Sequence, residues 1–159
     1  MRRTRRALLA LVLGATTVLA VPEPSFDPSL KGSTTEADVQ VDGVLINCMS
    51  PNHDFPDLAS ATIKGTGRAT AGSGLPCEPL LTIDGTLTID WPGPHGSKAS
   101  FHVNTNPFNG PVVIEVELTD GPLTGDRLVP LIEEVKPNLD CPLIGLKSLS
   151  TELAQAVFK

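Results

Sequence analysis

Aromatic residues are scarce in this chain: it has no tyrosine, and Trp91 is its only tryptophan. Sugar-binding β-sandwiches often stack sugar rings on exposed aromatic side chains, so this scarcity counts against that class of site. Trp91 also shares the parity of the apolar residues in its segment, and a large aromatic side chain contributes most when it is buried. Core packing therefore explains Trp91 better than ring stacking does.

The familiar sequence motifs of catalysis are missing as well. The chain has no GxSxG elbow, no Walker loop, no dinucleotide fingerprint, no CxxC pair and no HExxH motif. Catalysis needs a base held against a nucleophile and donors aimed at the developing charge. Because no segment combines these groups, we predict no catalytic residues, no bound cofactor and no metal centre.

The chain also lacks an apolar run long enough to span a bilayer as a helix. Its longest one, from Ala7 to Ala20, is too short, and four arginines lie among the six residues before it. This pattern predicts a signal peptide over residues 1–20, cleaved after Ala20. The pair Arg5-Arg6 resembles a twin-arginine signal, which leaves two export routes open. We expect a secreted protein, free in the medium or associated with the cell surface.

Basic residues are few once the signal peptide is removed. The remaining 139 residues carry 8 basic and 18 acidic side chains, a net charge of −10. This balance argues against nucleic-acid partners, which are bound largely through Lys and Arg, and it disfavours anionic membrane surfaces. No second long apolar run follows, so we expect no integral membrane span. The length is typical of one domain.

Proline and glycine interrupt the chain throughout, with 15 and 14 residues. Residues 21–37 are rich in Pro, Ser and Thr and are predicted to form a flexible leader. From residue 38 to 159, short β-branched and aliphatic runs alternate with turn residues, which is typical of strands. We predict an all-β domain, a single antiparallel β-sandwich or small β-barrel of about seven strands. The tail from Leu149 to Phe158 is assigned as a strand.

Strict alternation of apolar and polar residues marks the predicted core. It is clearest between Leu81 and Trp91, where Gly85 allows a bend or bulge, and it recurs around Phe101 and Ile114. The predicted core residues are Leu81, Ile83, Leu87, Ile89, Trp91, Phe101, Val103, Ile114, Val116 and Leu118.

Several short motifs resemble, in their order, a family of uncharacterised secreted proteins of actinobacteria with Gly/Thr-rich β-strands and three spaced cysteines. The motifs are Cys48-Met-Ser-Pro, Gly65-Thr66-Gly67 leading to Cys77, the run from Gly85 to Trp91, the run from Gly121 to Asp126, and Asn138-Leu139-Asp140-Cys141. The resemblance implies secretion and β structure, and it transfers no catalytic residue.

Three cysteines in an exported chain permit one disulfide. The possible pairs are Cys48–Cys77, Cys48–Cys141 and Cys77–Cys141. An up-and-down meander would bring Cys77 and Cys141 to the same pole and Cys48 to the other. This favours Cys77–Cys141, with Cys48 as the alternative partner. A reactive cysteine is not expected, because no Cys-His signature accompanies these residues.

The three histidines lie in separate segments, at His53, His95 and His102. Their spacing matches no zinc motif, so two loop histidines and one on the wet face of a strand are expected. His53 lies beside Asp54 and near Asp57, an arrangement that acid–base chemistry could use.

Two carboxylates, Glu115 and Glu117, project from the same strand face. Such a pair could begin a glycosidase site if it were buried. Because both alternate with core residues, we expect them to face solvent.

These observations favour a non-catalytic extracellular β domain that binds an extracellular protein or small ligand, or that forms part of the secreted or cell-surface layer. Two alternatives remain from other classes. One is a small secreted hydrolase that uses His53 and nearby carboxylates. The other is a barrel that carries a small apolar ligand between its aliphatic inward faces.

Overall fold

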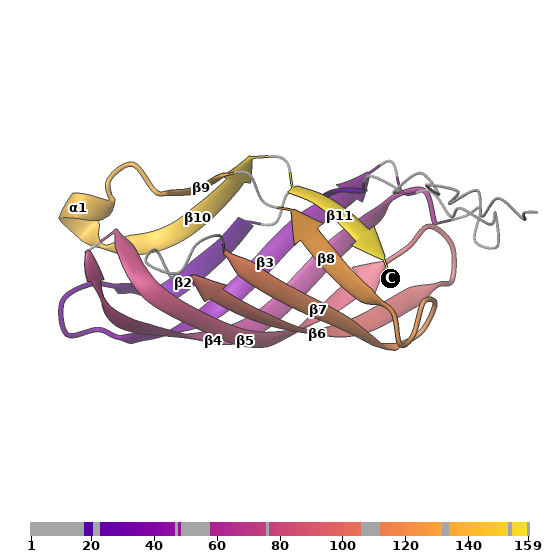
Figure 1. The fold of residues 1–159 in the computed structure, drawn as a ribbon, viewed down its shortest axis with the longest axis horizontal. Helices are drawn as coiled ribbons and strands as arrows, with labels where there is room; N and C mark the ends of the chain where they lie inside the picture. The colour runs from indigo at the N-terminus through magenta and orange to yellow at the C-terminus, as the bar shows by residue number, and fades with distance from the viewer. Residues whose placement is uncertain are drawn as a thin grey trace, which may run out of the picture.

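The computed structural model describes residues 18–20, 23–46, 48, 58–75, 77–105, 112–131, 134–152 and 154–158. Within these residues the chain is mostly β-strand, with a single helix of four residues, α1 (Cys141–Ile144) (Figure 1). The prediction of an all-β chain is confirmed. The strands are β1 (Val18–Ala20), β2 (Glu23–Leu30), β3 (Glu36–Ile46), β4 (Ala61–Leu75), β5 (Glu78–Asp90), β6 (Gly96–Thr105), β7 (Val113–Asp120), β8 (Arg127–Leu131), β9 (Glu134–Pro137), β10 (Leu146–Glu152) and β11 (Ala154–Phe158).

All 11 strands belong to one sheet, in the order β1-β11-β8-β7-β6-β5-β4-β3-β2-β10-β9. Every pairing is antiparallel, and the sheet curls into a half-barrel around its apolar face (Figure 1). One curled sheet can bury an apolar face without a second layer. The sheet is not the predicted sandwich, and it has more than the predicted number of about seven strands. Its half-barrel curl is nearer to the predicted alternative, a small β-barrel.

The flexible leader expected over residues 21–37 is also a wrong prediction for most of its length. Glu23–Leu30 form β2, which pairs with β3 in a register that places Phe26 opposite Val39. Phe26 and Leu30 are buried in the core. Burial of these two side chains outweighs the low strand preference of the prolines between and around them.

The last three residues of the predicted signal peptide, Val18–Ala20, form β1. Its Ala20 pairs with Ala154 of β11 on one side and with Leu45 of β3 on the other. Cleavage after Ala20 would remove this strand and leave those two strand edges without it. Residues 1–17 lie outside the residues that the structure describes.

The strands from β3 to β8 follow one another as a meander, and each pairs with the next. Side chains of alternate residues point to opposite faces of a strand, so one face of the meander is apolar and buried while the other is polar. We call the polar one the outer face. Of the predicted core residues, eight are buried and two are partly buried against the core; the latter are Val103 and Ile114.

Trp91 is part of the core, as its parity predicts. It is 3% exposed, and its indole Nε1–H donates to Ser97 Oγ at 3.0 Å. The Ser97 hydroxyl in turn donates to the carbonyl of Pro122 at 2.7 Å. These hydrogen bonds satisfy the polar atoms that burial of Trp91 and Ser97 removes from water.

Gly85 lies in the middle of β5, where the Phe101 ring and the backbone of Thr66 come close to it. It pairs with Gly67 and Phe101 in a regular register, so β5 continues through it without a bulge. A Cβ atom at Gly85 would come within 2.4 Å of the Phe101 ring and of the carbonyl oxygen of Thr66. The aromatic ring therefore covers the glycine, and only glycine fits there.

Strands β9 and β10 form one border of the sheet, where β10 pairs with β2 and with β9. The connection from β9 to β10 holds α1, whose Cys141 is joined to Cys77 by a disulfide with a Cα–Cα distance of 5.9 Å. The pairing favoured by the meander argument is confirmed. Among the described residues the only helix is this one turn, which is far too short to cross a membrane.

Candidate binding site on the outer face

A row of ionisable side chains crosses the outer face from β3 to β7. The strand register places Asp38 opposite Arg68, Arg68 opposite Asp84, Asp84 opposite His102 and His102 opposite Glu115. Directly paired residues in an antiparallel sheet have Cβ atoms about 5 Å apart, so neighbours in this row can interact. Acidic and basic side chains alternate along the row, so neighbouring groups do not repel one another.

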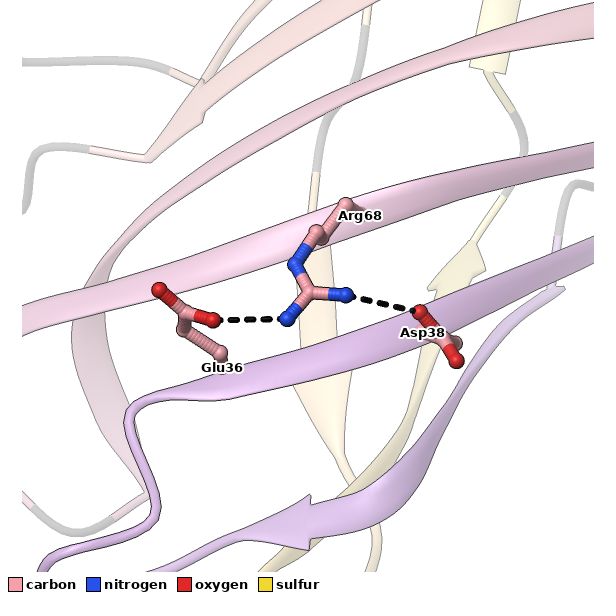
Figure 2. Close-up of polar contacts among 3 residues, drawn as sticks. All are labelled: Glu36, Asp38 and Arg68. Carbon is pink, nitrogen blue, oxygen red and sulfur yellow. Dashed lines mark hydrogen bonds and ion pairs between the residues drawn. The ribbon is translucent and has the colours of Figure 1, made fainter.

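Arg68 links the two acidic residues of β3. Its guanidinium donates from Nη2 to Glu36 Oε2 at 2.6 Å and from Nη1 to Asp38 Oδ1 at 3.3 Å (Figure 2). The hydrogen bond to Glu36, and then the charges of Glu36 and Asp38, raise the pKa of Arg68 above its ordinary value. The guanidinium stays charged at every physiological pH, and its charge is compensated by two carboxylates.

The next members of the row, Asp84 and His102, form a hydrogen-bonded pair. Asp84 Oδ1 lies 2.6 Å from His102 Nδ1. The carboxylate selects the tautomer that carries a proton on Nδ1, and it leaves Nε2 as the ring's other hydrogen-bonding atom. The imidazole side chain is 40% exposed and the carboxylate 71%. The pair is therefore open to solvent and to a ligand.

An open hollow lies beside this pair, lined both by charged residues of the outer face and by buried core residues such as Phe101 and Val116. It has a volume of about 640 Å³ and is bounded by β5, β6, β7 and β8. Its ionisable residues are Asp84, His102, Glu115, Glu117 and Arg127. Arg127 Nη2 lies 3.9 Å from Glu117 Oε2, at the limit of an ion pair, and both side chains are more than half exposed. Three carboxylates face one guanidinium and one imidazole, so the hollow favours cationic groups.

The side chains of this hollow can bind a charged ligand. Within the described part of the chain, no cluster of three or more His, Cys, Asp or Glu side chains has a geometry that could hold a metal ion. Its carboxylates can accept hydrogen bonds from ammonium or guanidinium groups, which form the strongest pairs with them. Exposed ion pairs are individually weak, so recognition would require several at once.

The structure separates most of the site candidates that the sequence offers. His95 is exposed in the turn between β5 and β6, whereas His102 lies on the wet face of β6, as expected. His53, Asp54 and Asp57 lie outside the described residues.

The paired carboxylates Glu115 and Glu117 are both exposed on β7, so the expectation that they face solvent is confirmed. Burial, which a glycosidase pair would need, is absent at both positions.

Cys48 is the free cysteine among the described residues, and it is buried. Desolvation by burial is the largest influence on its thiol and raises its pKa to about 11, against a lowering contribution from a backbone hydrogen bond. A thiol with such a pKa is almost wholly protonated at neutral pH. It is therefore a poor nucleophile, in agreement with the absence of a Cys-His signature.

The sequence alone did not identify the Asp84–His102 pair. Alternation places both residues on polar faces, but only the register between β5 and β6 makes them neighbours. That register depends on the turn from Pro92 to His95, whose length gave no recognised hairpin signal.

Comparisons with known proteins give no further assignment: no family model, no curated protein and no solved structure matches this chain.

Proposed function

We propose that this chain is a secreted, non-catalytic β domain that binds an extracellular partner through the outer face of its sheet. The observation that carries the proposal is the acidic hollow over β5–β8, together with the Asp84–His102 pair at its border. The ligand class that fits is cationic, such as an arginine- or lysine-rich peptide segment. A small disulfide-bonded domain is compatible with an extracellular location.

Exposure of the ionisable groups supports binding over catalysis. Enzymes usually exclude water from reacting groups, because a low dielectric strengthens their electrostatic interactions. Here the carboxylates of Asp84 and Glu117 are 71% and 56% exposed. The inward side chains of the meander also pack against one another, Leu45, Leu81 and Ile89 being at most 2% exposed. This packing favours a filled core over a cavity for an apolar ligand.

The test is binding of a hexa-arginine peptide, measured by calorimetry at low and physiological salt. Glu115→Gln and Glu117→Gln should each weaken binding by about two- to fivefold, which is the range of an exposed ion pair. The matched control is Asp42→Asn, which removes one charge from the same face at β3. Equal weakening by all three variants would contradict a localised site, as would a wild type that does not bind.

A second function deserves a test, because the Asp84–His102 geometry is the arrangement by which a carboxylate orients a general base. A hydrolase that used this pair would lose turnover in His102→Ala and retain most of it in His95→Ala. A panel of ester, peptide and glycoside substrates distinguishes the two functions: turnover by the wild type that disappears only in His102→Ala would replace the binding proposal.

A further inference from the structure

A second surface lies at α1, at one end of the long axis of the molecule (Figure 1). We call the segment 138–147 the α1 knob. Its Leu139 is 102% exposed, Leu143 76% and Ile144 37%. A leucine with its full surface in water forgoes the stabilisation that burial provides. Exposure of both Leu139 and Leu143 within one short segment indicates a contact surface.

The knob is held in shape by bonds that do not depend on burying these leucines. Cys141 is tied to Cys77, and the backbone N–H of Gly145 donates to the carbonyl of Cys141 at 2.8 Å. Asn138 ties the start of the connection to its end: its Oδ1 accepts from the N–H of Lys147 at 2.8 Å, and its Nδ2 donates to the carbonyl of Gly145 at 3.2 Å. The leucines are therefore presented outward by a fixed backbone.

Gly145 is required by this shape. Its φ is +92°, a conformation that favours glycine, and an added Cβ would lie 2.7 Å from Lys31 Cβ. Close packing here brings Lys31 against the knob, where its ammonium donates to the carbonyl of Leu143.

Two lysines accompany the exposed leucines. Lys147 ends the knob, and Lys31 contacts it from the end of β2. Asp140 is the only acidic residue in the segment.

We propose that the α1 knob docks this protein on an anionic lipid surface, with Leu139 and Leu143 entering the boundary between headgroups and acyl chains. The lysines would then contact the phosphate headgroups. The net charge of −10 expected after cleavage at Ala20 disfavours such a surface for the molecule as a whole, but charges more than about 8 Å apart are largely screened at physiological salt. The acidic outer face lies on other strands, so the charges nearest to the lipid surface are those of the knob.

The test is co-sedimentation with vesicles of phosphatidylcholine alone and of phosphatidylcholine with phosphatidylglycerol. The protein is used in the form that the cell exports, with its N-terminus determined, and every variant is compared in that same form. Any lipid affinity of the N-terminal apolar segment is then common to all samples. Wild type should bind the anionic vesicles preferentially, and binding should weaken with added salt.

Two pairs of variants locate the contact. The double variant Leu139→Asp with Leu143→Asp should lower partitioning at least about tenfold, whereas Val44→Asp, an exposed apolar position on β3, should not. Lys147→Glu should lower it about fivefold and Lys64→Glu, on β4, should not. Far-UV circular dichroism confirms that each variant is folded.

Three results would overturn the proposal. The first is a folded wild type that binds neither vesicle, which would leave a protein groove as the occupant of the knob. The second is equal binding to both compositions, and the third is binding that the leucine variants leave unchanged.

Discussion

The β3–β8 meander and the α1 knob are held in shape by different interactions, and they expose different kinds of side chain. In the meander, alternate side chains are buried and the opposite face carries paired charges, such as Arg68 with Glu36. In the knob, a disulfide and one asparagine side chain fix the backbone, and the leucines face solvent. Core packing stabilises the meander, whose exposed surface is polar. The disulfide and hydrogen bonds stabilise the knob, whose apolar side chains remain available for contact.

The largest effect should come from removing packing in the meander. Ile89 is 1% exposed, so Ile89→Ala should lower the free energy of unfolding by about 2 to 5 kcal/mol. Ile114→Ala should cost less, because Ile114 is only partly buried. Urea denaturation measures both, with the outward Thr86→Ala as control. Equal losses at Ile89 and Thr86 would contradict the assignment of the inner face.

Removing the disulfide should have the next largest effect. The double variant Cys77→Ala with Cys141→Ala opens a connection between residues 64 positions apart, and the expected loss is about 2 to 4 kcal/mol. Hydrogen exchange should show the fastest opening in the knob, while the amides of β4–β6 keep most of their relative protection. Uniform loss of protection across both regions would mean that the two are not stabilised separately.

Asn138→Ala isolates the hydrogen bonds of the knob. The variant leaves the N–H of Lys147 and the carbonyl of Gly145 without their side-chain partner, at a cost of about 1 to 3 kcal/mol if those groups stay shielded from water. Asn104→Ala, on the outer face of β6, is the matched control. If the denaturant midpoint of Asn138→Ala were unchanged, the Asn138 side chain would not stabilise the knob.

Cys48 gives a pH signature that appears only above about pH 9. Its pKa is raised from 9.0 to about 11 in the folded protein, so the folded state holds the proton more tightly than the unfolded state. The resulting stabilisation is complete below pH 9 and is lost as the pH rises toward about 11. Comparing wild type with Cys48→Ala across this range tests the sign. A loss of the same size in the variant would assign the pH dependence to other groups.

Sequence alternation predicted the meander because Leu81, Ile83 and Ile89 repeat the two-residue period of a strand. It missed β2, since Pro24 and Pro28 concealed the buried Phe26 and Leu30. The Cys77–Cys141 pair was predicted from a simple meander and is confirmed, although Cys141 lies in α1, outside the β3–β8 meander.

The candidate surfaces were harder to predict than the fold. The hollow depends on register, which polar parity alone does not determine. Exposure of Leu139 and Leu143 depends on the tertiary position of α1, and the composition of the segment carries no sign of it.

The most direct test of the account is residue-resolved NMR of the protein during titration with the hexa-arginine peptide. We expect shift changes at Asp84, His102, Glu115 and Glu117, and none at Leu139 or Lys147. This result would place cation binding on the outer face and separate it from the α1 knob. Shift changes concentrated at the knob, or spread evenly over every acidic residue of the surface, would contradict the proposed site.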